Sequence, residues 1–211
     1  MPGRGSKRRP YAPRMPTEER RRQLLDATLR IVVERGHHKV TMETVGEEAG
    51  VTKPVVYGVF HSRGELLAAL LEREQQGAVE QVMSAFTDGR VDLARMPPDE
   101  LIAGITRAYL DGVREEEYRW RCILFAVEGA PRELRAAIAE SREQLRVTLA
   151  GVLESFVATQ SAAPAVDIDI ASHSLVAFAE RAGQLILDQP ETYTVDRFVK
   201  ASKVLLRLLQ P

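Results

Sequence analysis

The sequence predicts an all-α protein with a three-helix helix-turn-helix domain at its amino-terminal end and a larger helical domain after it. Apolar residues recur at helical spacing, while strand-like alternation is scarcely visible. The segment from Thr41 to Phe60 has the layout of two short helices joined by a glycine turn. Of the 211 residues, 45% are apolar, which is enough for a packed core.

The amino-terminal end combines a basic arm with a first helix. Residues 1–16 are rich in Arg, Gly and Pro, and we expect a flexible arm because such a segment cannot bury enough apolar surface to order itself. Thr17 is expected to cap a helix that stops at Gly36. One face of this helix carries an apolar stripe made of Leu24, Ala27, Thr28 and Ile31.

The first helix of the helix-turn-helix is expected between Thr41 and Gly50. The Thr41 hydroxyl can accept a backbone N–H that the first helical turn leaves unpaired. Gly50 ends the helix, because glycine takes a left-handed backbone conformation without steric cost. Small Gly46 and Ala49 let two helices cross closely. Met42, Val45 and Ala49 recur at helical spacing, which leaves Glu43, Glu47 and Glu48 for solvent.

The second helix of the motif is expected to be capped by Thr52. Pro54 fits its first turn, where the missing N–H breaks no helical bond. The side chains expected to bury toward the helix crossing are Val51 and Val56, and those expected to face outward are Lys53, Val55 and Tyr57. A helix-turn-helix that binds DNA places this second helix in the major groove, so the motif predicts DNA binding.

Longer helices follow the motif. Ser62 stands three residues before Glu65 and predicts a capping box that opens a helix running to about Phe86. Later helices are expected over residues 98–113, 117–129, 131–159, 167–188 and 194–209. The chain therefore divides into an arm at 1–16, a helix-turn-helix domain at 17–63 and a helical domain at 64–211.

The charge distribution supports contact with DNA at one end of the chain. Residues 1–16 contain five basic and no acidic side chains, residues 17–67 contain eight of each, and residues 68–211 contain 16 basic and 22 acidic side chains. This pattern is expected if only the first third of the chain approaches phosphate. Arg8, Arg9 and Arg14 of the arm are candidates for the adjacent minor groove, although a basic tail that only aids solubility is the alternative.

Several protein classes are excluded by the sequence. The longest apolar runs are far shorter than the roughly 20 residues of a membrane-spanning helix, and the basic start is followed by acidic residues rather than an apolar signal segment. We therefore expect a cytoplasmic protein. Cys122 is the only cysteine, so an intrachain disulfide and a multi-cysteine zinc site are excluded. It is more simply read as a small buried residue than as a redox sensor.

Catalytic motifs are also missing from the sequence. It contains four histidines and no Ser/His/Asp arrangement, phosphate-binding glycine loop or HExxH pair, so we expect no enzyme, no metal and no cofactor. Two rival interpretations are an enzyme or small-molecule carrier built on a helical bundle, and a helix-turn-helix that contacts only proteins. The second rival leaves the basic arm unexplained.

The residues around the motif resemble a known family. A first helix ending near Gly36 is followed by T-x-x-x-V-G-x-x-A-G-V-T, then by V-Y-x-x-F, and then by S-R-x-E-L-L. This order is similar to the DNA-binding domain of the TetR family of bacterial transcriptional regulators, over about residues 20–70. The resemblance implies a homodimeric, ligand-responsive regulator, most often a repressor, that binds a palindromic double-stranded DNA operator.

The resemblance also implies which residues contact DNA. Thr41 and Tyr57 would contact phosphates, and the residues near base edges would be Thr52, Lys53, Pro54 and Val55. Arg63 matches a basic position that helps hold the DNA backbone, and His61 is an additional phosphate candidate. Gly58 and Val59 depart from the aromatic and histidine that the family commonly has there, which removes two phosphate contacts. Phe60 is expected to be a core aromatic.

The larger domain is expected to bind an unknown small-molecule effector and to dimerise. The ligand-binding candidates, each with a plain core or surface role as the alternative, are Tyr109, Tyr118, Trp120, Arg121, Phe125 and Glu128. The last two helices carry more apolar surface than one subunit requires, which predicts a four-helix dimer interface. Its candidate residues are Leu175, Phe178, Ala179, Ala182, Gly183, Ile186, Phe198, Leu205 and Leu208.

Overall fold

A computed structural model describes residues 15–91, 95–125, 132–159 and 167–208. Within these ranges the regular elements are helices, with no strand, so the all-α prediction is confirmed. They are α1 (Thr17–Arg35), the 3₁₀ turn η1 (His37–Lys39), α2 (Met42–Ala49), α3 (Lys53–Tyr57), α4 (Arg63–Thr87), α5 (Pro98–Glu115), α6 (Glu117–Phe125), α7 (Arg132–Thr159), α8 (Ile168–Asp188) and α9 (Val195–Leu208).

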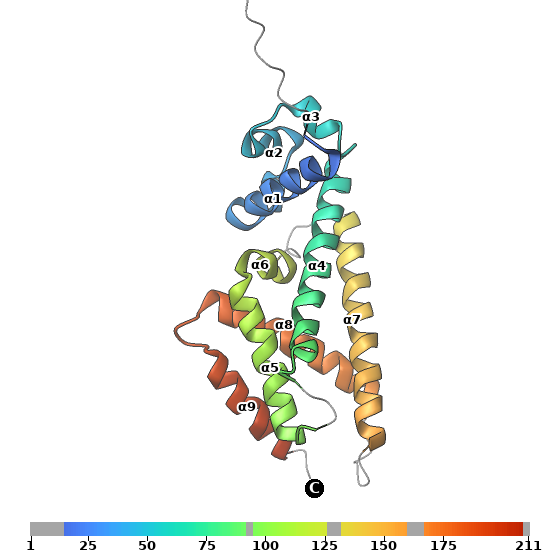
Figure 1. Cartoon of the computed structure of the whole chain (residues 1–211), viewed down its shortest axis with the longest axis vertical. Helices are drawn as coiled ribbons and strands as arrows, with labels where there is room; N and C mark the ends of the chain where they lie inside the picture. Colours follow the sequence, from blue (N-terminus) through green and yellow to red (C-terminus); the bar gives the residue numbers. More distant parts are fainter. Residues whose placement is uncertain (1–14, 92–94, 126–131, 160–166, 209–211) are drawn as a thin grey trace, which may run out of the picture.

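The long helix α4 connects two groups of helices. Helices α1, α2 and α3 gather at one end of the molecule, and α4 runs from there alongside α7 into the second group (Figure 1). In that second group, α5 packs along α9 and α7 packs against α8. Helix α6 lies between α1 on one side and α5 on the other (Figure 1), and it packs against both α1 and α4.

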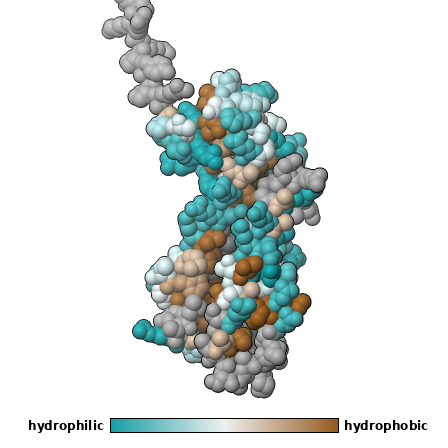
Figure 2. All heavy atoms as spheres, turned by 90° about the vertical axis from the view of Figure 1, so that its right-hand side faces the viewer, coloured by the Kyte–Doolittle hydropathy of each residue, from teal (hydrophilic) through white to brown (hydrophobic). Residues whose placement is uncertain are grey.

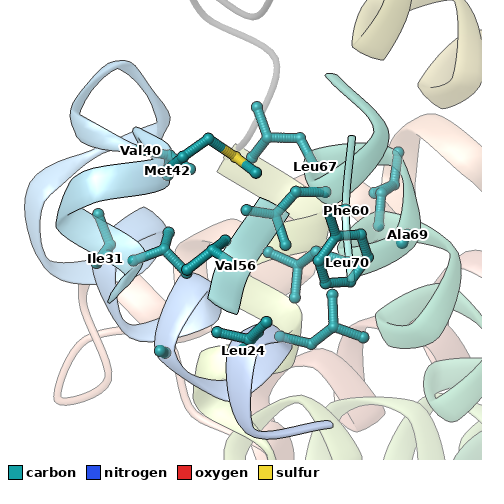
Figure 3. Close-up of a cluster of buried hydrophobic side chains, with 14 of the residues drawn as sticks. Leu24, Ile31, Val40, Met42, Val56, Phe60, Leu67, Ala69 and Leu70 are labelled. Atoms are coloured by element: carbon teal, nitrogen blue, oxygen red, sulfur yellow. The ribbon is translucent and has the colours of Figure 1, made fainter. Parts of the chain in front are cut away.

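The first hydrophobic core holds the amino-terminal helices together. Leu24, Val56 and Phe60 have no exposed surface and come from α1, α3 and the segment before α4, which meet in this core (Figure 3). The same cluster includes Cys122 from α6 and Ile138 from α7. The core therefore continues across the boundary predicted between residues 63 and 64.

A second core occupies the carboxyl-terminal group, and it corrects part of the predicted dimer interface. Ala182 and Ile186 of α8 are 2% and 1% exposed and belong to this core, together with Trp120 and Leu124 of α6. Gly183 is also buried, and a Cβ placed there would lie 2.7 Å from both Leu124 Cδ1 and Tyr109 Oη. The small residues that predicted close approach of a second subunit instead permit close packing within one subunit. Placing Ala182, Gly183 and Ile186 at the dimer interface was therefore wrong.

The helix ends agree with their local signals except at two threonines. Gly50 has the left-handed conformation (φ 67°, ψ 31°), and the Ser62 hydroxyl accepts from Glu65 N at 3.1 Å, both as predicted. Thr17 is the first residue of α1, whose N-cap position is Pro16, so Thr17 does not cap it. Thr52 holds the N-cap position of α3 but makes no capping hydrogen bond with its side chain. A threonine before a helix can occupy the cap position without supplying the bond.

Replacing Gly183 by Ala is expected to lower the free energy of unfolding by about 1–3 kcal/mol, because the added methyl group overpacks the contact with Leu124 and Tyr109. Gly151→Ala is the matched control, because a Cβ at that helical position meets nothing within 4 Å. The control should gain up to about 1 kcal/mol from helix propensity. Urea unfolding followed by circular dichroism measures both changes, and equal stabilities of the two variants would contradict this packing.

Candidate nucleic-acid interface

The turn between α2 and α3 brings two backbones into close contact. Val51 N donates to Gly46 O at 2.8 Å, directly after the left-handed Gly50. A Cβ on Gly46 would lie 2.9 Å from Val51 O, a distance that real Cβ atoms essentially never show. Glycine at this position is therefore required for α2 to cross the start of α3 closely.

Helix α3 is anchored by one side and presents the other to solvent. Val56 is completely buried in the first core, while Val55 and Tyr57 on either side of it are 38% and 46% exposed. The other exposed residues at the start of the helix are Thr52, Lys53 and Pro54. This is the orientation that the sequence predicted for Val56, Lys53, Val55 and Tyr57. Phe60 is fully buried beneath the Arg21 guanidinium, whose Cζ lies 4.8 Å from the ring centroid.

Thr41 organises the amino-terminal end of α2. Its hydroxyl accepts from Thr44 N at 3.0 Å, and the Thr44 hydroxyl accepts from Thr41 N at 2.9 Å, which completes a reciprocal capping box. The Thr44 hydroxyl also donates to Lys39 O at 2.9 Å, so the cap is joined to the preceding turn. Thr41 itself remains exposed beside this helix end. The unpaired N–H groups and the positive end of the helix dipole make such a helix end favourable for binding an anion.

Arg63 supports this helix end from the first position of α4. Its Nε donates to Val40 O at 2.7 Å and its Nη2 donates to His37 O at 2.9 Å. The half-buried guanidinium therefore fixes the segment that precedes the Thr41 cap. Sequence reasoning missed this intramolecular role, because the two carbonyls lie more than 20 residues away along the chain.

Helix α1 supports the helix-turn-helix through contacts with α2. Gln23 Nε2 donates to Ala49 O at 2.9 Å, which satisfies a carbonyl at the carboxyl end of α2. Glu48 was expected to lie free in solvent, but its carboxylate pairs with Arg30 at 2.9 Å and with Arg35 at 3.0 Å. The hydrogen bond from Arg30 lowers the pKa of Glu48. These contacts join α2 to α1.

The remaining predicted DNA contacts are His61 and three arginines of the arm. The His61 side chain is exposed, and its backbone N–H donates to Glu65 Oε2 at 2.7 Å. The Glu65 carboxylate therefore accepts from the backbone of His61 and not from that of Ser62, so only the Ser62 half of the predicted capping box forms. Arg8, Arg9 and Arg14 lie outside the described residues.

The predicted ligand-binding residues separate into different environments. Tyr109 and Trp120 are packed edge to face at 5.1 Å, and their polar atoms are satisfied by Ala179 O and Gln81 Oε1 at 2.9 and 3.1 Å. Burial raises the pKa of Tyr109. Both side chains therefore pack in the second core, and their role in ligand binding stays a prediction.

Arg121 and Phe125 of α6 lie together. The Arg121 Cζ is 5.7 Å from the Phe125 ring centroid, and the guanidinium donates to Glu117 Oε1 at 2.7 Å and to Leu187 O at 2.8 Å. Tyr118 points to the opposite side, where its hydroxyl donates to Glu34 Oε1 of α1 at 3.0 Å. Tyr118 therefore joins α6 to the amino-terminal helices. Glu128 lies outside the described residues.

The remaining predicted dimer residues are only partly accessible. Phe178 is 40% exposed and its ring lies 6.2 Å from that of half-buried Phe198, while Leu175 and Ala179 are also half-buried. The side chains of Leu205 and Leu208 lie outside the described residues.

Other kinds of site find no support in the described parts of the chain. They contain no cluster of three or more His, Cys, Asp or Glu residues able to hold a metal ion. Burial raises the pKa of the Cys122 thiol to about 12, which leaves almost no reactive thiolate at neutral pH. None of the described helices is long and apolar enough to cross a membrane.

Comparison with known proteins agrees with this geometry. Residues 24–70 match the family model described as bacterial regulatory proteins, tetR family. The HTH-type transcriptional activator FasR of Mycolicibacterium smegmatis is 34% identical over 113 residues, covering 52% of this chain and 48% of that protein. The HTH-type transcriptional repressor KstR of Rhodococcus jostii is 34% identical over 119 residues, covering 56% and 53%. The matches therefore span about half the length of these curated relatives.

The likeness to a solved structure extends over most of the fold. The transcriptional regulator FadR from Bacillus subtilis, solved in complex with stearoyl-CoA, aligns with a TM-score of 0.72 at 15% identity. This alignment covers 90% of this chain and 99% of that one, so both helical groups share the fold. With the glycine turn, the exposed α3 and the family match in agreement, residues 24–70 form a helix-turn-helix domain of the TetR family of bacterial transcriptional regulators.

Proposed function

We propose that this protein is a dimeric, ligand-responsive transcriptional repressor that binds a palindromic DNA operator. The observation that carries the proposal is the outward presentation of α3, whose exposed Lys53, Val55 and Tyr57 surround a fully buried Val56. A short convex helix held this way fits the major groove. The activator FasR and the repressor KstR both resemble this chain, so repression is the part of the proposal that needs a transcription measurement.

Each exposed side chain has a distinct role in this proposal. Lys53 reaches guanine acceptors from the start of α3, while Pro54 and Val55 pack against a thymine methyl group. Thr41 and Tyr57 bind phosphates on either side of the groove. Arg63 acts indirectly, because its guanidinium holds the segment before Thr41 in place.

The sequence predicted a dimer interface on the last two helices, α8 and α9. Because α9 packs its apolar side against α5 within the subunit, we propose α7 and α8 in its place. Along α8, Ile170, Ser174 and Phe178 form an exposed row at helical spacing. The neighbouring α7 exposes Leu145 and Val152, which lie seven residues apart on one side of the helix and are 44% and 45% exposed. Viewed from the α7 side, the lower half of the molecule as drawn shows hydrophobic side chains at its surface (Figure 2). Helix pairs from two subunits would bury these side chains in a four-helix interface.

A small molecule is the proposed effector of the carboxyl-terminal group of helices. FadR from Bacillus subtilis, which shares this fold, was solved with stearoyl-CoA, and that likeness supports a ligand-binding role without identifying the ligand here. To act as a switch, the effector must bind one state of the protein more tightly than the other. A non-enzymatic role is part of the proposal.

The proposed function is tested by selecting fragments from a random duplex library with the full-length protein and measuring their affinity over a range of salt concentrations. We expect palindromic fragments whose half-sites are about 34–36 Å apart or further, and an affinity that falls steeply with salt. An enzyme, a carrier or a module that binds only proteins would retain no fragment even at low salt. A transcription assay on the selected operator then tests repression.

Lys53→Ala and Arg63→Ala should affect DNA binding differently. Loss of Lys53 should relax base preference at one position of each half-site by roughly 1–3 kcal/mol, because it removes a direct base contact. Loss of Arg63 should weaken binding to all sequences alike, because it loosens the segment before the Thr41 cap. Binding to a set of single-base operator variants measures both effects. An equal loss of specificity in the two variants would sink these assignments.

Ile170→Glu is expected to convert the dimer into a monomer, because it places a charge in the proposed α7–α8 interface. The matched control is Val204→Glu, which changes a comparably exposed apolar residue of α9, since Ile170 and Val204 are 61% and 55% exposed. Light scattering after size-exclusion chromatography reads the molar mass directly. A monomer produced by the control, with Ile170→Glu still dimeric, would move the interface to α9.

A further inference from the structure

A groove lies between the first half of α1 and the middle of α4. The two helices meet near the upper end of α4 as drawn (Figure 1), and the groove beside their contact has a volume of about 440 Å³. Its apolar lining comes from Leu25 of α1 and Ala69 of α4, which are 4% and 9% exposed, and its other lining residues are charged or polar. None of the residues proposed to contact DNA or to bind the effector lines this groove.

The α1 side of the groove carries a net positive charge. Arg21 and Arg22 line this side together with one carboxylate, that of Glu18. The Cζ of Arg21 lies 4.8 Å from the ring centroid of Phe60. This contact orients the guanidinium without supplying an oxygen acceptor, so its N–H groups can still bind an oxyanion. Neither arginine side chain makes an ion pair or a hydrogen bond with another residue that the structure describes.

The α4 side of the groove carries an uncompensated negative charge. Arg73 lines this side, but it pairs with Asp26 at 2.6 Å and with Glu74 at 2.5 Å, so its charge is already matched. Glu72 lines the same side and is exposed, and its carboxylate makes no ion pair or hydrogen bond within the described ranges. Charges of opposite sign therefore line the two sides of the groove without pairing with each other.

The separation of these charges limits the chemistry of the ligand. The axes of two packed helices lie about 8–10 Å apart, so a compact ion cannot contact the charged groups on both sides. A carboxylate matches the fork of donors on a guanidinium, and an ammonium group pairs with a single carboxylate. An apolar chain between two such ends would cover Leu25 and Ala69. Duplex DNA fits less well, because its phosphates would meet the carboxylates of Glu18 and Glu72.

We propose that this groove binds a small zwitterion with an unbranched apolar chain between its charged ends. The anionic end contacts Arg21 and Arg22 on α1, and the ammonium end contacts Glu72 on α4. This site is additional to the effector site of the proposed function, and its occupation does not depend on DNA binding. A molecule with only one of the two charges would use one side of the groove and would bind less tightly.

The test is a ligand-observed NMR titration of the full-length protein at neutral pH and constant ionic strength. The probes are ε-aminohexanoate, hexanoate and hexylammonium, which share one apolar chain and differ in their charged ends. The zwitterion should bind at least about fivefold more tightly than either single ion, because it forms an ion pair on each side of the groove. Hexanoate or hexylammonium binding as tightly as the zwitterion overturns the inference, and so does a zwitterion that does not bind.

Two substitutions of exposed residues test the location of the site without removing core packing. Arg22→Gln should weaken the zwitterion at least about threefold and leave hexylammonium unchanged, whereas Glu72→Gln should weaken it similarly and leave hexanoate unchanged. Arg114→Gln is the matched control, because Arg114 of α5 is also exposed and has no ion pair in the described part of the chain. It should keep the wild-type affinities. Wild-type affinity in both groove variants, or an equal loss in the control, places the binding elsewhere and overturns the inference.

Discussion

The burial of Val56 and Phe60 is the interaction on which the DNA-facing surface depends. Helix α3 has five residues, far fewer than a helix needs to persist in water by its own hydrogen bonds. Its conformation is stabilised because Val56 within it and Phe60 after it are fully buried among the side chains of α1 and α4. The orientation of the exposed residues of α3 therefore depends on the core. A less stable core would leave the DNA-facing surface of the proposed function less well ordered.

The same core joins the amino-terminal helices to the rest of the subunit. Cys122 and Ile138 come from α6 and α7, yet they pack with Leu24 and Phe60, so the amino-terminal helices do not form an isolated module. At the same junction Glu74 of α4 is 3% exposed and lies 3.4 Å from Arg119 of α6, and a low local dielectric strengthens this contact between charges.

Helix boundaries were predictable because their signals are local. Gly50, Thr41 and Ser62 act on backbone groups within one helical turn. Gly50 and Thr41 perform the predicted role, and Ser62 forms its half of the predicted capping box. Long-range partners were not predictable in this way. Glu48 has the same local pattern as a solvent-exposed residue, but α1 brings Arg30 and Arg35 to it. Arg63 likewise has its carbonyl partners in η1 and in the loop before α2, which no spacing within α4 could indicate.

The helical class, the positions of the helices and the outward side of α3 follow from the order of the residues, because periodicity and capping depend on residues a few positions apart. Which partner each apolar face meets follows from the packing of helices that are distant along the chain. In α8, Ala182, Gly183 and Ile186 face the subunit's own core, while Ile170 stays exposed. In α6, Trp120 packs into the second core, whereas Tyr118, two residues before it, is 40% exposed and donates to Glu34 of α1. An amphipathic pattern shows that a face must be buried, but the partner depends on how distant helices pack.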